Sequence, residues 1–487
     1  MAAKTFRLIE SGNKSEVLGR VIEAGVMGLV VAAPLALGSS GAIASSVMQV
    51  VSFLVFGIWL FKISIEGNAK TQPAPLFIFF AAFLALVLLQ MLPLPIGAVS
   101  FISPNTAATL KTFLPEGEAA AWRTLSLYPY ATKAEFFKFL SYALLFVAVA
   151  NHYKSRKQIE RLSAVIIALG VFITVFAVAQ KLTWNGKFYW FYDLGVNIES
   201  NMTYVWGPYV NHNNFAAYME MAVPLALGML IYRLSNVKSL PGLPLARRLA
   251  RLMDSGDMWP MAMFAFSALL MSAALFMSLS RGGIIGFSIS ILFFIIMGFT
   301  RRSLKKWTAL IGAAAVIAAL LLAIFSWDGI ERRFSEIGGE GRTPRFEIWK
   351  DSANMVGDFP LTGTGLGTFK SVYPMYQSHS PAFFFAHAEN DYVEFLTDTG
   401  AAGLFVIMSA IIFYFVRVIR RWRSRNNTFV KCMGLAGLTS CVAILVHSMS
   451  DFNMRIPANA LLITIISALT YAIVYAIGRG GGANERG

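Results

Sequence analysis

His387 is the residue most suited to acid–base chemistry, because polar and acidic side chains follow it at helical intervals. It lies in the segment Ala-His-Ala-Glu-Asn-Asp-Tyr-Val-Glu, and Asn390, Asp391 and Glu394 come three, four and seven residues later. These intervals place the side chains on one face if a helix begins here. A histidine beside carboxylates can have a raised pKa and serve as a general base. Alternatively, Asp391 only caps the helix and His387 is an interfacial group.

Arg281 stands where a phosphate could bind. It lies in the segment Ser-Arg-Gly-Gly, and the two glycines open the apolar run 283–299. A helix N-terminus presents unpaired N–H groups, and beside an arginine these groups can hold an anion, phosphate especially. The alternative is that the Arg281 side chain only extends to the lipid head groups.

Two further arginines, Arg342 and Arg345, lie in the segment Gly-Arg-Thr-Pro-Arg-Phe-Glu-Ile-Trp. Pro344 suits the first position of a helix, and that helix would carry Arg345 and Trp349 on one face. These arginines are therefore candidates for binding an anionic group. A solvated basic turn is the alternative interpretation.

Other polar side chains flank or interrupt the apolar runs. Asn211 and Asn214 precede a run that continues to residue 232, where they could cap a helix or bind sugar hydroxyls. Glu220 lies within that run, and a carboxylate at such a position usually faces the bundle interior or a cavity. It can be a structural partner for an arginine or a functional group. Asp451 belongs to a short polar turn that either supports a site or is only well hydrogen-bonded.

The composition shows what must position these residues. Of the 487 residues, 56% are hydrophobic and only 14% are charged, against about 25% in an average soluble domain. This excludes a soluble enzyme, a disordered chain and a fibrous protein. The apolar runs are continuous rather than alternating, which predicts about twelve membrane-spanning helices and an all-α polytopic membrane protein. The runs cover residues 21–38, 42–61, 74–92, 137–150, 162–180, 214–232, 259–279, 283–299, 307–326, 391–416, 432–448 and 457–477.

The net charge of +15 indicates topology rather than an acidic partner. With twelve spans, the strong basic clusters all fall on the side of the N-terminus, which the positive-inside rule makes cytoplasmic. Both termini are then cytoplasmic, and 478–487 is a flexible tail of one integral domain, 1–487. The clusters are Lys154–Arg161, Arg247–Arg251, Arg301–Lys306 and Arg417–Arg425.

Three long segments fall on the outer side of this arrangement, at about 93–136, 181–213 and 327–390. The segment 327–390, between the ninth and tenth spans, is rich in aromatic residues, which favours an ordered loop lying at the membrane interface. The segment 93–136 contains three prolines early in its length, and its role is left open. The candidate residues from 281 to 451 gather at this outer face.

Nothing in the sequence predicts a cofactor or a metal. The glycine-rich segment Gly363-Thr-Gly-Leu-Gly lacks a strand–turn–helix context, and no Walker motif, Asp-x-Asp pair or zinc spacing occurs. Cys432 and Cys441 lie in one apolar run and indicate no disulfide framework.

Taken in order, these motifs resemble the O-antigen ligase and O-antigen polymerase family of bacterial membrane glycosyltransferases. The resemblance covers roughly residues 200–460, and the large loop between spans nine and ten extends it to the whole chain. The motifs are Asn211-His-Asn-Asn-Phe-Ala-Ala-Tyr, Ser280-Arg-Gly-Gly, Arg345-Phe-Glu-Ile-Trp, Gly363-Thr-Gly-Leu-Gly-Thr-Phe, Ala386-His-Ala-Glu-Asn and His447 with Asp451-Phe-Asn.

The resemblance implies a GT-C-like, metal-independent, inverting glycosyltransferase of the inner membrane with a periplasmic active site. A glycan would move from undecaprenyl pyrophosphate to an acceptor hydroxyl on lipid A–core. By the same resemblance, His387 would deprotonate the acceptor, and Arg281 and Arg345 would hold the pyrophosphate. Supporting contacts would come from Asn211, Asn214, Asn390 and Asp451. Glu220 and Arg342 are further candidates for substrate binding, from their residue type and position alone. The motif reads His-Ala-Glu-Asn where relatives often have His-x-His-Asn, which makes Glu389 a candidate for part of a second histidine's role.

Other acceptors and one other class of protein stay open. A polymerase would join lipid-linked repeat units, and a protein O-oligosaccharyltransferase would use a Ser or Thr hydroxyl. A bicarbonate transporter is favoured only by Glu220, because the other polar groups gather at one face and not at mid-membrane. The expected partners are the lipid-linked donor and acceptor, the bilayer and, as candidates, polysaccharide-assembly proteins. No nucleic acid is expected.

Overall fold

The computed structural model describes residues 2–67, 75–113, 121–193, 207–236, 256, 258–314, 344–379 and 384–477. Within these ranges, ten helices are long and apolar enough to cross a membrane. The expected all-α polytopic membrane protein is therefore confirmed. The expected run 74–92 forms a helix of only 16 residues. The run 307–326 extends beyond the described residues, so the number of twelve spans stays a prediction.

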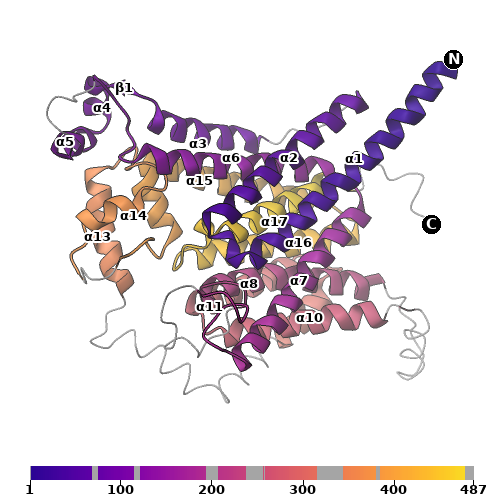
Figure 1. Ribbon diagram of the computed structural model, residues 1–487. Helices are drawn as coiled ribbons and strands as arrows, with labels where there is room; N and C mark the ends of the chain where they lie inside the picture. The colour runs from indigo at the N-terminus through magenta and orange to yellow at the C-terminus, as the bar shows by residue number, and fades with distance from the viewer. Residues whose placement is uncertain are drawn as a thin grey trace.

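The long helices run in both directions through one bundle (Figure 1). They are α1 (Ala2–Leu35), α2 (Ala42–Glu66), α3 (Leu76–Met91), α6 (Pro129–His152), α7 (Arg156–Leu182), α8 (His212–Asn236), α10 (Met258–Met277), α11 (Arg281–Phe299), α15 (Asp391–Arg423), α16 (Thr428–His447) and α17 (Pro457–Tyr475). Short elements are α4 (Ile96–Ile102), α5 (Pro104–Phe113), α13 (Pro344–Asp358), α14 (Phe369–Val372), β1 (Leu94–Pro95), β2 (Trp122–Arg123), η1 (Leu37–Ser39), η3 (Tyr373–Met375) and η4 (Asn453–Arg455).

Helices α8, α16 and α17 form the centre of the bundle. In Figure 1, α16 and α17 lie between the group of α7, α8, α10 and α11 and the group of α2, α3, α6 and α15. Small residues allow the central helices to approach closely, as is common in membranes. Gly228 of α8 packs on Ala436 of α16, and the Ser440 hydroxyl donates to the Met221 carbonyl at 2.7 Å. In the apolar part of helix α15, by contrast, few residues are buried.

The described part of the large loop has its own small core. Helices α13 and α14 and the turn η3 enclose Ile348, Met355, Phe359, Phe369 and Tyr373, which are all buried. The aromatic composition of the loop therefore corresponds to packing within the protein. Its position on the outer side of a membrane stays a prediction.

The segment 93–136 packs against this loop. Strands β1 and β2 pair antiparallel, with Leu94 opposite Arg123, and α4 and α5 lie between them in the sequence. The Asn105 amide donates to the Asp358 carbonyl at the end of α13, at 3.0 Å. Helix α6 begins at Pro129, earlier than the apolar run 137–150 indicates, because proline suits the first helical turn.

Two glycines let the loop cross α15 in direct backbone contact. Gly400 interrupts the helix with φ +63° and ψ −172°, a conformation that side chains strongly disfavour. A Cβ on Gly400 would collide with the backbone of Leu361, and one on Gly363 would collide with the backbone of Asp398. The Gln90 amide joins the two segments, because it donates to the Asp398 carbonyl at 2.9 Å and to the Thr362 carbonyl at 2.7 Å.

We therefore expect Gly400→Ala to destabilise the protein by about 1–3 kcal/mol from backbone strain alone, with the collision adding to this. Thermal unfolding of the purified protein in detergent should show a Tm several degrees below that of the unchanged protein. Gly357→Ala is the control, since a Cβ there meets open space within α13. Equal Tm values for the two variants would contradict the crossing.

Candidate functional site

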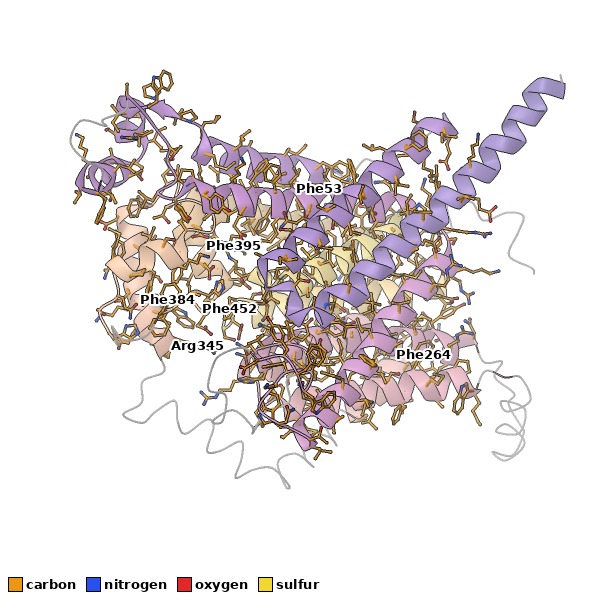
Figure 2. All side chains as sticks on the ribbon, in the orientation of Figure 1. Phe53, Phe264, Arg345, Phe384, Phe395 and Phe452 are labelled. Carbon is orange, nitrogen blue, oxygen red and sulfur yellow. The ribbon has the colours of Figure 1, made fainter. Side chains whose placement is uncertain are left out.

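The candidate residues converge where several helices end. The N-terminal ends of α8, α11, α13 and α15 meet the C-terminal end of α16 and the turn η4. Figure 2 shows Arg345 and Phe452 close together, with Phe395 farther into the bundle. Arg342 lies outside the described residues. The other sequence-predicted residues fall into three groups, around His387, Arg345 and His447.

The first group orients His387. Its Nδ1 atom lies 3.0 Å from Oε1 and 3.3 Å from Oε2 of Glu394, one turn into α15. The imidazole also stacks on the Phe452 ring, with ring centroids 4.3 Å apart. The side chain keeps 30% of its surface exposed, whereas Glu394 keeps only 3%. A carboxylate on Nδ1 fixes the tautomer in which Nε2 is the basic nitrogen.

The charge of Glu394 also changes the proton affinity of its partner. Burial by itself lowers the pKa of His387, because it penalises the charged ring. The negative charge and hydrogen bond of Glu394 outweigh burial, so the net pKa of His387 lies above its ordinary value. The ring is therefore a better proton acceptor than a free histidine.

Arg455 supports Glu394 and was not among the predicted residues. Its Nε lies 3.1 Å from Glu394 and its Nη2 lies 2.7 Å from Asp398, and both carboxyl groups are almost fully buried. Its guanidinium also stands over the Phe395 ring at 4.5 Å. Burial lowers the pKa of Arg455, but Glu394 and then Asp398 raise it overall. Little in the sequence distinguishes Arg455 as a site residue, since it is one of several polar residues in the same turn.

The second group joins Arg345 to two carboxyl groups. Its Nη2 lies 3.0 Å from Oε2 of Glu389 and 3.7 Å from Oδ2 of Asp451. Asp451 is buried, and its Oδ1 accepts the backbone N–H of Phe452 at 2.8 Å. Burial, followed by the charge of Asp451, raises the pKa of Glu389 to about 7. The guanidinium of Arg345 thus lies between two carboxyl groups, and each of them can form an ion pair with it.

The third group surrounds His447. Its Nδ1 lies 3.0 Å from Oε1 of Glu220, and both side chains are fully buried. Its Nε2 lies 3.5 Å from the hydroxyl of Ser280, which accepts the Gly283 N–H and so caps α11. Arg281 is the first residue of that helix. Glu220 therefore faces the bundle interior as expected, but its partner is a histidine and not an arginine.

The asparagines have mainly structural contacts in this state. Asn390 caps α15, because its Oδ1 accepts the N–H groups of Tyr392 and Val393 at 3.0 and 3.2 Å. Its amide donates to the Met449 carbonyl at 2.8 Å. Asn211 caps the first turn of α8. The backbone carbonyl of Asn214 accepts from Asn459 at 3.1 Å.

The assembled groups offer one base, basic side chains for an anion and hydrogen-bonding amides. In the parts of the chain that the structure describes, no cluster of three or more His, Cys, Asp or Glu side chains has a geometry for a metal ion. The chemistry that these residues support by themselves is proton transfer at His387 beside an anion bound at Arg345.

Glu394→Gln should lower the pKa of His387, because burial then acts without an opposing charge. The pH dependence of His387 modification by diethyl pyrocarbonate, followed by mass spectrometry, measures this, and reaction should begin at lower pH in the variant. The raised pKa of His387 also affects stability. The pair stabilises the folded protein at pH values below the ordinary pKa of histidine, and this stabilisation is lost as the pH rises through the pKa of His387 in the folded protein. Glu160→Gln, in an exposed pair with Arg156 on α7, is the control. An unchanged profile in Glu394→Gln would rule out the assigned effect.

One comparison with known proteins gives a match to part of the chain. No curated protein matches the chain. Residues 266–408 match the model of the family described as O-Antigen ligase, and this range includes Arg281, Arg345, His387 and Glu394. Members of this family are membrane glycosyltransferase-like enzymes of the ligase or polymerase type, and they act on lipid-linked glycans. The match bears out the resemblance seen in the sequence motifs, and it shows that this part of the multi-pass membrane protein is similar to the O-antigen ligase family.

Proposed function

We propose that the protein transfers a glycan from undecaprenyl pyrophosphate to a hydroxyl of lipid A–core at the periplasmic face of the inner membrane. The observation that carries this proposal is the partly exposed His387, held at Nδ1 by the buried Glu394. A ligase needs a base beside a site for an anionic leaving group. Arg345 and His387 lie near one another, joined through the adjacent residues Asp451 and Phe452.

The reaction is a single displacement. The acceptor hydroxyl oxygen attacks the anomeric carbon while its proton passes to Nε2 of His387. The bond from the anomeric carbon to the pyrophosphate oxygen breaks, and that oxygen leaves with the electron pair. Attack opposite the leaving group inverts the anomeric configuration. Arg345 and Arg281 stabilise the negative charge on the departing pyrophosphate, where it grows in the transition state.

Glu389 has a defined part in this scheme. Oε2 of Glu389 lies 3.0 Å from Nη2 of Arg345. The guanidinium of Arg345 is the group that the pyrophosphate would engage. When the pyrophosphate takes over the guanidinium, the displaced carboxyl group can take up a proton, because its pKa is already about 7. This proposed role of Glu389, to hold Arg345 until the pyrophosphate binds, differs from the role of the second histidine that relatives often have at this position. Asp451, at 3.7 Å, would keep Arg345 in place during the exchange.

We expect His387→Ala to lower the transfer rate by about 10²–10⁴-fold, the usual contribution of a general base. Transfer from a purified lipid-linked donor to lipid A–core, with membrane levels checked in parallel, is the measurement. His379→Gln is the matched control, because His379 lies in the same loop but pairs with Asp351 at 3.3 Å. Full activity of His387→Ala would remove this residue from the mechanism.

Arg345→Ala should reduce transfer because the leaving group loses a charge partner, and Arg345→Lys should restore only part of it. Both effects should appear in kcat as well as in KM, since the charge develops during the reaction. Arg281→Ala should abolish transfer at normal membrane levels. If a variant of either arginine changes only KM, that arginine binds the substrate in its ground state and does not stabilise the transition state.

The rate should rise with pH, because the base acts in its neutral form. The raised pKa of His387 places the midpoint of this rise above the ordinary histidine value. In Glu394→Gln the midpoint should move to lower pH while the plateau rate falls, since a weaker base accepts the proton less readily. Rates measured from pH 5 to 9 (about the range in which histidine titrates) test this, and a flat profile would contradict it.

The polymerase alternative uses the same base and leaving group with a different acceptor. Deleting the gene and analysing the envelope glycans separates the possibilities. Loss of polymer-capped lipopolysaccharide with accumulation of lipid-linked polymer supports the ligase. Lipopolysaccharide bearing a single repeat unit supports the polymerase. Unchanged glycans would contradict both and would leave a protein acceptor to be sought.

A further inference from the structure

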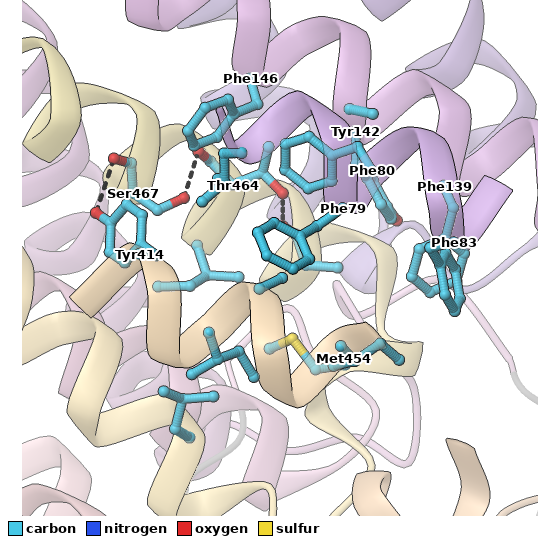
Figure 3. Close-up of a pocket in the computed structure, with 18 of the residues that line it drawn as sticks. Phe79, Phe80, Phe83, Phe139, Tyr142, Phe146, Tyr414, Met454, Thr464 and Ser467 are labelled. Carbon is cyan, nitrogen blue, oxygen red and sulfur yellow. Dashed lines mark hydrogen bonds between the residues drawn. The ribbon is translucent and has the colours of Figure 1, made fainter. Parts of the chain in front are cut away.

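A cavity of about 290 Å³ opens between helices α3, α6, α15, α16 and α17, and most of its wall is apolar. Figure 3 shows aromatic side chains from α3 and α6 on one side of it and residues of α15 and α17 on another. Its walls are mostly phenylalanine, leucine and isoleucine side chains. The aromatic lining residues include Phe79, Phe80, Phe83, Phe139, Tyr142, Phe146 and Tyr414.

The polar groups in the wall are mostly engaged within the protein. The Tyr414 hydroxyl donates to the Ser467 carbonyl at 2.9 Å, and the Thr464 hydroxyl donates to the Ala460 carbonyl at 2.7 Å (Figure 3). The Tyr392 hydroxyl likewise donates to the Leu445 carbonyl. An exception is the Tyr142 hydroxyl, which has no partner in the described residues. The cavity therefore suits a hydrocarbon, which needs no hydrogen bonds.

Helix α15 forms one wall and is poorly covered by the rest of the bundle. Its break at Gly400 divides the lining residues, with Phe395 before it and Val406 to Phe415 after it. Ile412 is 60% exposed on the same helix. In a membrane this surface faces lipid, so a chain from the bilayer could reach the cavity past α15.

The other end of the cavity reaches the candidate site. Asp391 lines the cavity, and its backbone N–H donates to the carbonyl of Asp451 at 3.1 Å. The side chain of Asp451 in turn lies 3.7 Å from Arg345. Asp391 is also four residues from His387 in the sequence. A chain in the cavity would thus bring an attached head group towards Arg345 and His387.

Resting on the proposed function, we propose that this cavity binds the hydrocarbon chain of a polyprenyl phosphate-type donor, whose phosphate end reaches Arg345. A single cavity of about 290 Å³ suits one chain, and a polyprenyl lipid has a single chain, whereas a phospholipid or lipid A has two or more. The cationic Arg345 complements the phosphate. Because the bilayer is as apolar as the cavity wall, the affinity comes from close packing of the chain against the wall, and this packing also positions the reacting bond.

Filling the cavity tests the assignment. Ala410 lines it from α15, and Ala401 is exposed and lies nine residues earlier, on about the opposite face of the helix. Ala410→Phe should raise the KM for a long-chain polyprenyl pyrophosphate donor by about tenfold, the effect of overpacking an occupied cavity. It should change the KM for a short-chain isoprenoid donor much less. Ala401→Phe should behave as the unchanged protein with both donors.

A binding measurement separates this inference from the proposed function. A photoreactive polyprenyl monophosphate without a glycan should crosslink to α3, α6 or α15 in the unchanged protein, and less so in Ala410→Phe. If the protein transfers no glycan but the crosslink forms and is weakened by Ala410→Phe, the proposed function fails and the cavity assignment stands. Equal KM values for Ala410→Phe and Ala401→Phe would overturn the assignment. So would crosslinking there by a photoreactive phosphatidylglycerol in preference to the polyprenyl probe.

Discussion

The buried guanidinium of Arg455 holds the functional end of the protein together. It pairs with Glu394, which binds His387, and with Asp398, whose carboxylate accepts the backbone N–H of Gly367 at 2.7 Å. One positive charge thus couples His387 to the glycine-rich loop. Removing one partner of a buried ion pair costs about 3–5 kcal/mol, because an uncompensated charge stays behind. The loop, α15 and η4 therefore keep one arrangement.

Two histidine–glutamate pairs have the same geometry but different surroundings. His387 with Glu394 and His447 with Glu220 each join Nδ1 to a carboxylate oxygen at 3.0 Å. The first imidazole is partly exposed, while the second pair is sealed within the bundle beside the cap of α11. The two histidines therefore differ in solvent access. His387 can exchange a proton with a bound molecule, whereas His447 is buried and helps to fix the helix that carries Arg281.

Much of the local structure was predictable from short-range patterns. Continuous apolar runs predicted the long helices because backbone groups in a bilayer must be satisfied within each segment. The spacing of His387 and Glu394 predicted a shared face, although His387 precedes α15 and reaches Glu394 from the preceding turn. Proline spacing likewise predicted that α13 begins at Pro344. Asn390 was expected to contact substrate, yet its side chain is engaged as the N-cap of α15.

The sequence by itself determined a helical membrane protein, the family motifs and a short set of candidate residues, since these depend on composition and local spacing. Only the tertiary structure decided which partners meet. Arg455 and Asp398 are 57 residues apart, and His447 and Glu220 are 227 apart. Such pairs depend on how helices pack, and no local pattern encodes that. The apolar cavity is a similar case, because its wall is built mainly from five helices that are spread from residue 76 to residue 467 of the sequence.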